Sequence, residues 1–230
     1  MTAMPKKLSA ITITLLLVSG LSYLAIPRTI AAVMMVPGNV VLEDIQTGRS
    51  VSNRDLRLLV KSRQDGLRWI DSGRVRTDLG LAWLLLAEGD AGDAEYDKEM
   101  LALGLRELKA GLAKAPARPF AWTRLALAEL LANGPSEKVD QAMHMSILTD
   151  RYNPMLLPIR IQLALEAWDV LSPDNRSLVH EQIRLAWRRA PDDLVKIGME
   201  TERADIIRAG LADSVGDLTE LERRLQLEKF

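Results

Sequence analysis

The sequence predicts an all-α protein, with one membrane-spanning helix near the N-terminus followed by a domain of packed helices. Two observations carry this prediction. Residues 8–26 form a run of 19 residues without a charge, and beyond about residue 50 the apolar residues recur with the 3.6-residue period of helices, not the two-residue period of strands. A chain of 230 residues is long enough for one domain of ordinary size beside such a segment.

The uncharged run has the length of a membrane span. As a helix of about 1.5 Å per residue it extends about 28 Å, close to the roughly 30 Å of a hydrocarbon core. Lys6 and Lys7 precede the run, and basic residues favour the cytoplasmic side. We therefore predict a cytoplasmic tail over residues 1–7, a signal anchor over residues 8–26, and the rest of the chain on the periplasmic side of the inner (plasma) membrane.

A cleaved signal peptide is the competing interpretation of this segment. Its apolar region is normally about 7–15 residues long and ends at a small-x-small cleavage site. The run here is longer and no such site follows, which favours the uncleaved anchor. The next apolar stretch, residues 29–36, is too short to span again and is followed by Pro37-Gly38. We expect a juxtamembrane linker over residues 27–52, without firm structure from about residue 40 to residue 49.

Helical patterns and capping residues divide the remainder, residues 53–230, into short-looped helices. Ser52 stands three residues before Asp55, which is the spacing of a capping box. Asn153-Pro154 and Ser172-Pro173 each place a capping side chain before a proline that suits a first helical turn. We expect helices near residues 53–71, 74–88, 96–115, 118–133, 136–151, 157–171, 174–190 and 192–211, and a last one through Leu218, Leu221 and Leu225.

Three predicted helices are each followed by a proline at or near their C-terminal end, namely Pro116, Pro154 and Pro191. The intervals between these prolines are 38 and 37 residues, and each interval contains two predicted helices. Such a period is the sequence sign of stacked helical hairpins.

Within these units the chain resembles tetratricopeptide repeats (TPR). Trp122-x-x-Leu125-Ala126 is similar to the Trp-x-x-Leu-Gly of the first helix of that repeat, and Ala186 with Pro191 is similar to the Ala and closing Pro of the second. The resemblance covers about residues 74–191. It implies a TPR-like α-solenoid of about three to four helical hairpins, wound as a right-handed superhelix that binds proteins or peptides on its concave face.

The chain departs from the repeat pattern in two respects. Thr149 stands where the family usually has Ala, and the period exceeds the usual 34 residues. Some units are therefore expected to be degenerate, with residues 53–71 and 192–230 as capping helices.

No motif for catalysis, cofactor binding or metal binding is found in the sequence. His180 begins a His-Glu-x-x-Arg184 pattern that lacks the second histidine of a zinc site, and the only other histidine is His144. The acidic stretch from Glu88 to Glu99 does not have the spacing of a calcium loop, and we interpret it as a solvated loop. With no cysteine there is neither a disulfide nor a thiolate site. We assign no catalytic, cofactor or metal residue and predict that the protein is not an enzyme.

Charge points to a protein or membrane partner instead of nucleic acid. With 30 basic and 31 acidic residues the chain has a net charge of −1, and it lacks the excess of basic residues that binding to a phosphate backbone requires. Residues 49–76, however, carry eight basic residues against three acidic ones. This segment is either a solvated surface or a site for anionic lipid, anionic polymer or an acidic partner. Its candidate partner-binding residues are Arg54, Arg57, Lys61 and Arg68.

The expected function is that of a non-catalytic, membrane-anchored scaffold or adaptor that binds a protein partner on the non-cytoplasmic side. By analogy, chains of this design resemble accessory components of envelope or surface-polysaccharide assembly. The alternative is a carbohydrate- or lipid-binding module that uses tryptophans and the basic helix. Gathering of Trp69, Trp83 and Trp122 around one open cleft would favour the module, and their burial between helices would favour the scaffold.

Overall fold

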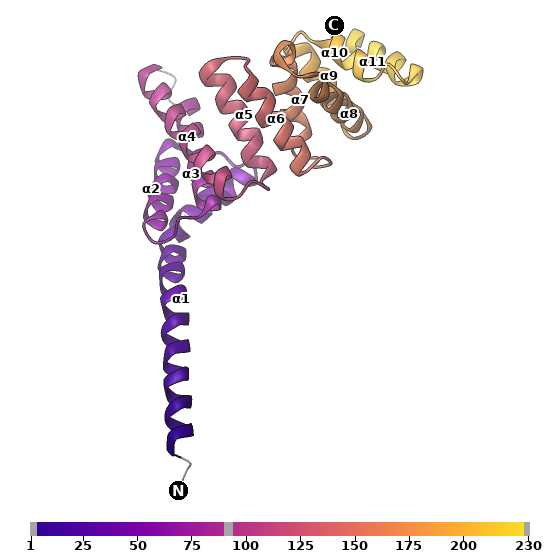
Figure 1. The fold of residues 1–230 in the computed structure, drawn as a ribbon. Coiled ribbons are helices and arrows are strands. Elements are labelled where there is room, and N and C mark those ends of the chain that lie inside the picture. Colours follow the sequence, from indigo (N-terminus) through magenta and orange to yellow (C-terminus); the bar gives the residue numbers. More distant parts are fainter. Residues whose placement is uncertain (1–3, 90–93, 228–230) are drawn as a thin grey trace.

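The computed structural model describes residues 4–89 and 94–227, and in these parts it is all-helical, without strands (Figure 1). The long first helix projects away from a body formed by the others, as a rod with the N-terminus at its free end. The helices are α1 (Met4–Gln46), α2 (Asn53–Leu67), α3 (Gly73–Gly89), α4 (Ala94–Lys114), α5 (Pro119–Asn133), α6 (Glu137–Thr149), α7 (Leu157–Glu166), a 3-10 turn (Trp168–Val170), α8 (Pro173–Arg189), α9 (Pro191–Glu200), α10 (Ala204–Gly210) and α11 (Val215–Leu227).

Helix α1 is long and apolar enough near the N-terminus to cross a membrane, as the sequence predicts. Over Ile11–Gln46 its mean hydropathy reaches 1.5. Its side chains between Ile11 and Ile26 are exposed almost without exception, including leucines and isoleucines that would be costly to leave in water. An exposed apolar surface of this extent is typical of a helix surrounded by lipid.

The expectation of an unstructured linker after the membrane segment is wrong. Helix α1 continues through Pro27 and Pro37 as far as Gln46. Its second half packs against α2, where Gly38 lies so close that an added Cβ would stand 2.0 Å from the Oγ of Ser62. This packing compensates for the backbone hydrogen bonds that the prolines cannot donate. The anchor and the domain are therefore joined by a packed helix.

Helices α3 and α4 form an antiparallel hairpin held unusually close by glycines. Gly73 faces Gly111 at one end and Gly80 faces Gly104 further along. A Cβ added to Gly73 would lie 2.7 Å from the carbonyl oxygen of Gly111. The two backbones are therefore too close at this point for any side chain to fit between them. The glycines thus fix how closely this hairpin packs.

The three proline-bearing segments follow the second helices of successive pairs. Pro116 comes after α4, Pro154 after α6, and Pro191 is the first residue of α9 after α8. The proline period of the sequence therefore corresponds to the pairs α3–α4, α5–α6 and α7–α8.

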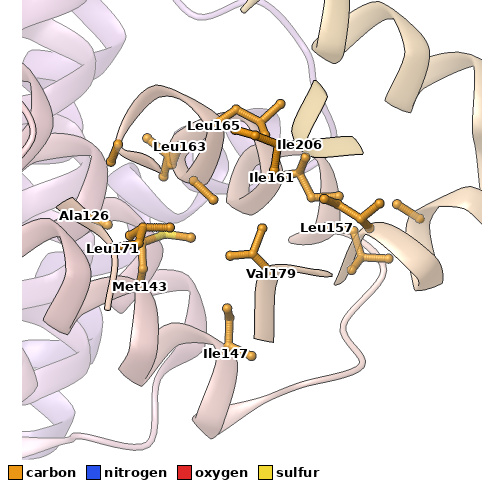
Figure 2. Packing of buried hydrophobic residues seen from close by; sticks show 14 of the residues in the cluster. Ala126, Met143, Ile147, Leu157, Ile161, Leu163, Leu165, Leu171, Val179 and Ile206 are labelled. Carbon is orange, nitrogen blue, oxygen red and sulfur yellow. The ribbon is translucent and has the colours of Figure 1, made fainter. Parts of the chain in front are cut away.

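The buried apolar side chains form two clusters. The larger one extends from α3 and α4 to α11 and is centred on residues such as Met143, Ile147, Ile161 and Ile183 (Figure 2). The smaller one joins the second half of α1 to α2, α3 and α4 through residues that include Val41 and Leu59. Leu125 and Ala126 of the repeat-like motif are buried in the larger cluster, and Trp122 is partly buried against it.

Several predicted helix boundaries are wrong. The helix expected at 53–71 ends at Leu67, and the one expected at 157–171 ends at Glu166 before the 3-10 turn. The helix expected at 192–211 is two helices, because Glu202 adopts a positive φ of 57° and the Arg203 amide bonds back to the Gly198 carbonyl. The expected acidic loop is mostly helix, because residues 88 and 89 are the last two of α3 and residues 94–99 begin α4, while residues 90–93 lie outside the described part.

Candidate interaction surfaces

The four predicted partner-binding residues lie along the exposed side of α2. Arg54, Arg57 and Lys61 are exposed, and Arg68, at the C-terminal cap of the helix, pairs with Asp65 at 3.2 Å. Because α2 runs antiparallel to α1, Arg54 is the one farthest from the apolar half of α1 and Arg68 the nearest. The structure thus places these residues in one basic stripe, and only its Arg68 end approaches the membrane segment.

The tryptophans do not gather around one open cleft. Trp69 is 47% exposed just after α2, whereas Trp187 is buried in the larger core cluster. Trp83 and Trp122 are half-buried against different clusters. The indole N–H of Trp122 donates to the Pro116 carbonyl at 2.7 Å, so this residue braces the start of α5 against the preceding loop.

The two histidines contact an amide side chain and an aromatic ring, respectively. His144 on α6 bonds through Nδ1 to the side-chain oxygen of Asn175 at 2.6 Å. His180 on α8 stacks on Trp168, and burial, with the charge of Arg184, lowers its pKa. Among the described residues no group of three or more His, Asp or Glu side chains stands close enough to hold a metal ion.

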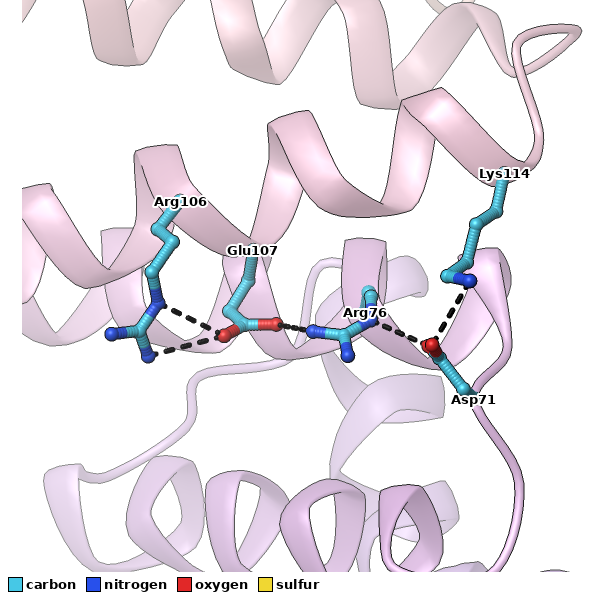
Figure 3. Close-up of polar contacts among 5 residues, drawn as sticks. All are labelled: Asp71, Arg76, Arg106, Glu107 and Lys114. Atoms are coloured by element: carbon cyan, nitrogen blue, oxygen red, sulfur yellow. Dashed lines mark hydrogen bonds and ion pairs between the residues drawn. The ribbon is translucent and has the colours of Figure 1, made fainter.

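A chain of alternating charges crosses the outer side of the α3–α4 hairpin (Figure 3). Arg76 joins Asp71 at 2.7 Å to Glu107 at 2.8 Å, Arg106 approaches Glu107 at 3.2 Å, and Lys114 approaches Asp71 at 2.9 Å. Hydrogen bonds from Arg76 and Lys114 lower the pKa of Asp71. These charges neutralise one another, so this surface has little net charge to offer a ligand.

An open groove runs between the C-terminal end of α3, α4 and the end of α5, and has a volume of about 620 Å³. Its floor is apolar, with Leu101, Leu105 and Leu131, and Leu131 is 53% exposed. Glu88 and Asp97 stand on its edge, against one lysine, Lys98. Desolvation raises the pKa of Glu88. The groove can therefore bury apolar side chains between acidic edges.

A second basic surface was not predicted from the sequence. Arg63 and Arg74 line one cleft together with the buried Asp78, and Arg118 and Arg124 line a second cleft. The charges of all four arginines act on Asp78, and we call this group the arginine cluster. Arg63 Nε stands 3.7 Å from Asp78. Burial raises the pKa of Asp78 in spite of the four cations, and burial lowers the pKa of Arg124.

The cluster gathers residues from α2, α3, the α4–α5 loop and α5. Arg63 and Arg74 belong to the basic segment 49–76 noted in the sequence, but no sequence pattern joins them to Arg118 and Arg124, which lie far along the chain. The one local signal is Arg118, which precedes Pro119 at a helix start that has no side-chain cap.

Comparison of the chain with protein-family models, with curated proteins and with solved structures found no match in any of the three.

Proposed function

We propose that this protein is a membrane-anchored, non-catalytic scaffold whose helical domain is a TPR-like solenoid and binds a protein partner on the non-cytoplasmic side. By analogy, this design suits envelope or surface-polysaccharide assembly.

The observation that carries the proposal is the rigid joint between anchor and domain. Arg63 of α2, only 2% exposed, donates from its guanidinium to the Met35 carbonyl at 3.1 Å and to Asn39 Oδ1 at 2.9 Å, both on α1. Together with the close approach at Gly38, these contacts fix the direction of the domain relative to the membrane helix. A protein that only had to be tethered would not need a packed joint, whereas a scaffold that presents a surface in one orientation does.

The groove between α4 and α5 supports a protein partner of definite chemistry. Two helices flank an apolar floor that contains Leu101, Leu105 and Leu131, and such a floor suits the apolar side of an amphipathic helix. Because Glu88 and Asp97 outnumber Lys98 on the edge, the partner helix is expected to carry basic residues beside its apolar stripe.

Site-specific photocrosslinking in cells tests the groove. A photoreactive amino acid at Leu131 or at Ala102, both on the groove wall, should give a covalent adduct with one protein. The matched control is the same label at Leu58, an exposed apolar residue on α2 away from the groove. Leu131→Glu should remove the adduct formed from Ala102. Equal labelling from Leu58, or no adduct from either groove position, would contradict this binding site.

The orientation rests on Lys6 and Lys7 before the apolar run. Reporter fusions at Lys7 and at Phe230 test it, and a cytoplasmic signal from the Phe230 fusion would overturn the proposed localisation.

The alternative, a carbohydrate-binding module built on tryptophans, has less support because Trp69, Trp83 and Trp122 do not share a cleft. The lipid-binding alternative does not depend on a shared tryptophan cleft, and it is supported by the arginine cluster.

A further inference from the structure

We propose that Arg74, Arg118 and Arg124 bind the phosphate of an anionic phospholipid headgroup at the point where α1 leaves the membrane. The inference rests on the membrane anchorage of α1, which is part of the proposed function, but it is independent of the protein partner.

The first step of the argument is the height of the cluster above the membrane. The apolar run ends at residue 26, so Arg28 lies at the edge of the hydrocarbon core. Arg28 and Ala31 of α1 line the same cleft, of about 320 Å³, as Ser72 and Arg74 at the start of α3. The cleft begins at Arg28 and continues along α1 as far as Asn39. Its Arg28 end lies at the headgroup layer, which is roughly 5–8 Å thick on each side of the core, and a long arginine side chain such as that of Arg74 can reach this layer from the cleft.

The second step places Arg118 and Arg124 at nearly the same level. Gly73 at the start of α3 faces Gly111 and Ala115 near the end of α4, so the α4–α5 loop lies at this end of the hairpin. Thr77, one helical turn above Gly73, lines a cleft of about 170 Å³ together with Arg118 and Arg124. Long arginine side chains can reach from such a position to the headgroups.

The third step is the missing partner of these cations. Within residues 4–89 and 94–227, no acceptor forms a side-chain hydrogen bond with Arg74, Arg118 or Arg124, and no carboxylate lies within ion-pair distance of them. Asp78 is the one carboxylate whose field acts on all three, and Arg63 approaches it more closely. The nearby Asp71 already holds Arg76 and Lys114. The cluster therefore retains an excess of positive charge, of the kind that a phosphate compensates.

The fourth step concerns the N-terminal end of α5, which lies beside the partly buried Arg118 and Arg124. Its N-cap residue, Arg118, makes no side-chain capping bond, and its first residue is Pro119. The amides of Ala121 and Trp122 bond back to the Arg118 carbonyl, which leaves the Phe120 amide at the positive end of a 15-residue helix. This end of α5 adds a favourable field for an anion to the two guanidinium groups.

Two aromatic side chains near these elements are exposed, and one of them, Phe120, lines the cleft of Arg118 and Arg124. Trp69, between α2 and α3, is 47% exposed, and Phe120 at the start of α5 is also exposed. Tryptophan is enriched at the level of lipid headgroups, where its apolar ring and polar N–H are both accommodated. The combination of unpaired arginines and exposed aromatic rings fits a membrane surface better than it fits a free phosphate ion.

Native mass spectrometry of the full-length protein in neutral detergent tests the proposal. The probes are phosphatidylglycerol, phosphatidylcholine of the same chain length, and inorganic phosphate. The protein should retain phosphatidylglycerol in preference to phosphatidylcholine. Arg118→Gln combined with Arg124→Gln should raise the dissociation constant for phosphatidylglycerol roughly 25-fold, because each basic residue near an anionic surface contributes about fivefold.

The control variant is Arg188→Gln with Arg189→Gln, which removes the same charge from two exposed positions at the end of α8 and should leave lipid retention unchanged. Arg74→Gln, at an exposed position, should weaken retention about fivefold without affecting the fold, and so serves if the double variant unfolds. Equal loss in the Arg188/Arg189 variant, undiminished retention in the cluster variants, or equal binding of inorganic phosphate would overturn the proposal.

Flotation with vesicles of pure phosphatidylcholine tests the anchorage separately. Failure of all variants to float would contradict the membrane anchor itself. Flotation of all variants combined with no preference for phosphatidylglycerol would contradict the headgroup site alone.

Discussion

Two buried arginines show how differently the membrane side and the C-terminal side of the domain accommodate a charge. Arg63 of α2 binds the Met35 carbonyl and Asn39 of α1, and its Nε stands 3.7 Å from Asp78 without a hydrogen bond to any described residue. Arg160 of α7, 1% exposed, is surrounded by hydrogen-bond acceptors. Its guanidinium donates to the Ser146 hydroxyl at 2.9 Å, the Asp150 carbonyl at 2.9 Å and Gln182 at 3.3 Å, and also to the Ser146 carbonyl.

The comparison separates a completed site from an incomplete one. Around Arg160 the last carbonyls of α6 and a side chain of α8 satisfy the cation, and burial lowers its pKa to about 10. Around Arg63 the charge is shared by four arginines and one carboxylate. Buried polar groups stabilise a fold when every member is satisfied. We infer that the C-terminal arginine fastens three helices together, whereas the membrane-side cluster is arranged to receive an anion from outside.

The largest effect is expected from Arg160→Met, which keeps the volume of the side chain but removes its donors. Four acceptors lose a hydrogen bond in a dry interior, so the free energy of unfolding should fall by about 3 kcal/mol. The control is Arg151→Met, at a partly exposed residue that pairs with Glu181 at 2.6 Å, where the loss should be below about 1 kcal/mol. Denaturant unfolding of the full-length protein in detergent measures both. Equal midpoints would show that the Arg160 network has no special role.

A smaller effect is expected from Gly111→Ala in the membrane-side hairpin. The new methyl would lie 2.8 Å from the Gly73 carbonyl and 2.7 Å from Thr77 Cγ2. Overpacking costs about 1–3 kcal/mol and outweighs the gain in helix propensity of up to about 1 kcal/mol. Gly216→Ala is the control, because no atom lies within 4 Å of its added Cβ and stability should be unchanged or slightly raised. The melting temperatures of the two variants, measured by thermal unfolding, test this prediction. A Gly111→Ala variant that is more stable than the parent protein would contradict the close packing.

The smallest effect concerns pH and separates two neighbouring carboxylates. Burial raises the pKa of Asp78 above 3.8, while hydrogen bonds to Arg76 and Lys114 lower that of Asp71 below 3.8. The contribution of Asp78 to stability is therefore present below pH 3.8 and is lost as pH rises through its folded pKa. The contribution of Asp71 to stability is present above pH 3.8 and is lost as pH falls through the folded pKa of Asp71. NMR titration of the aspartate side-chain carbons in the full-length protein tests whether the pKa of Asp78 is higher than that of Asp71. A higher pKa for Asp71 would refute the prediction.

Local sequence signals predicted the features that depend on a few neighbouring residues. The capping box at Ser52 and Asp55 is present, with the Asp55 amide bonded to Ser52 Oγ at 3.3 Å. The apolar N-terminal helix is also as predicted. The end of α9 was missed because it depends on the left-handed conformation of Glu202, in a segment without glycine or proline to mark a turn.

The sequence by itself determined three features: the helical class of the chain, the position of the apolar helix that could cross a membrane, and the prolines that follow successive helix pairs. Each of these features depends on residues within one or two helical turns of each other. Tertiary structure decided the course of residues 27–46, where packing of Gly38 and Met35 on α2 outweighs the local preference of Pro37 to interrupt a helix. It also decided the arginine cluster. The close α3–α4 hairpin brings the start of α5 back beside the start of α3, and this places Arg118 and Arg124 near Arg74 and Asp78. No local pattern encodes the proximity of residues so far apart in the chain.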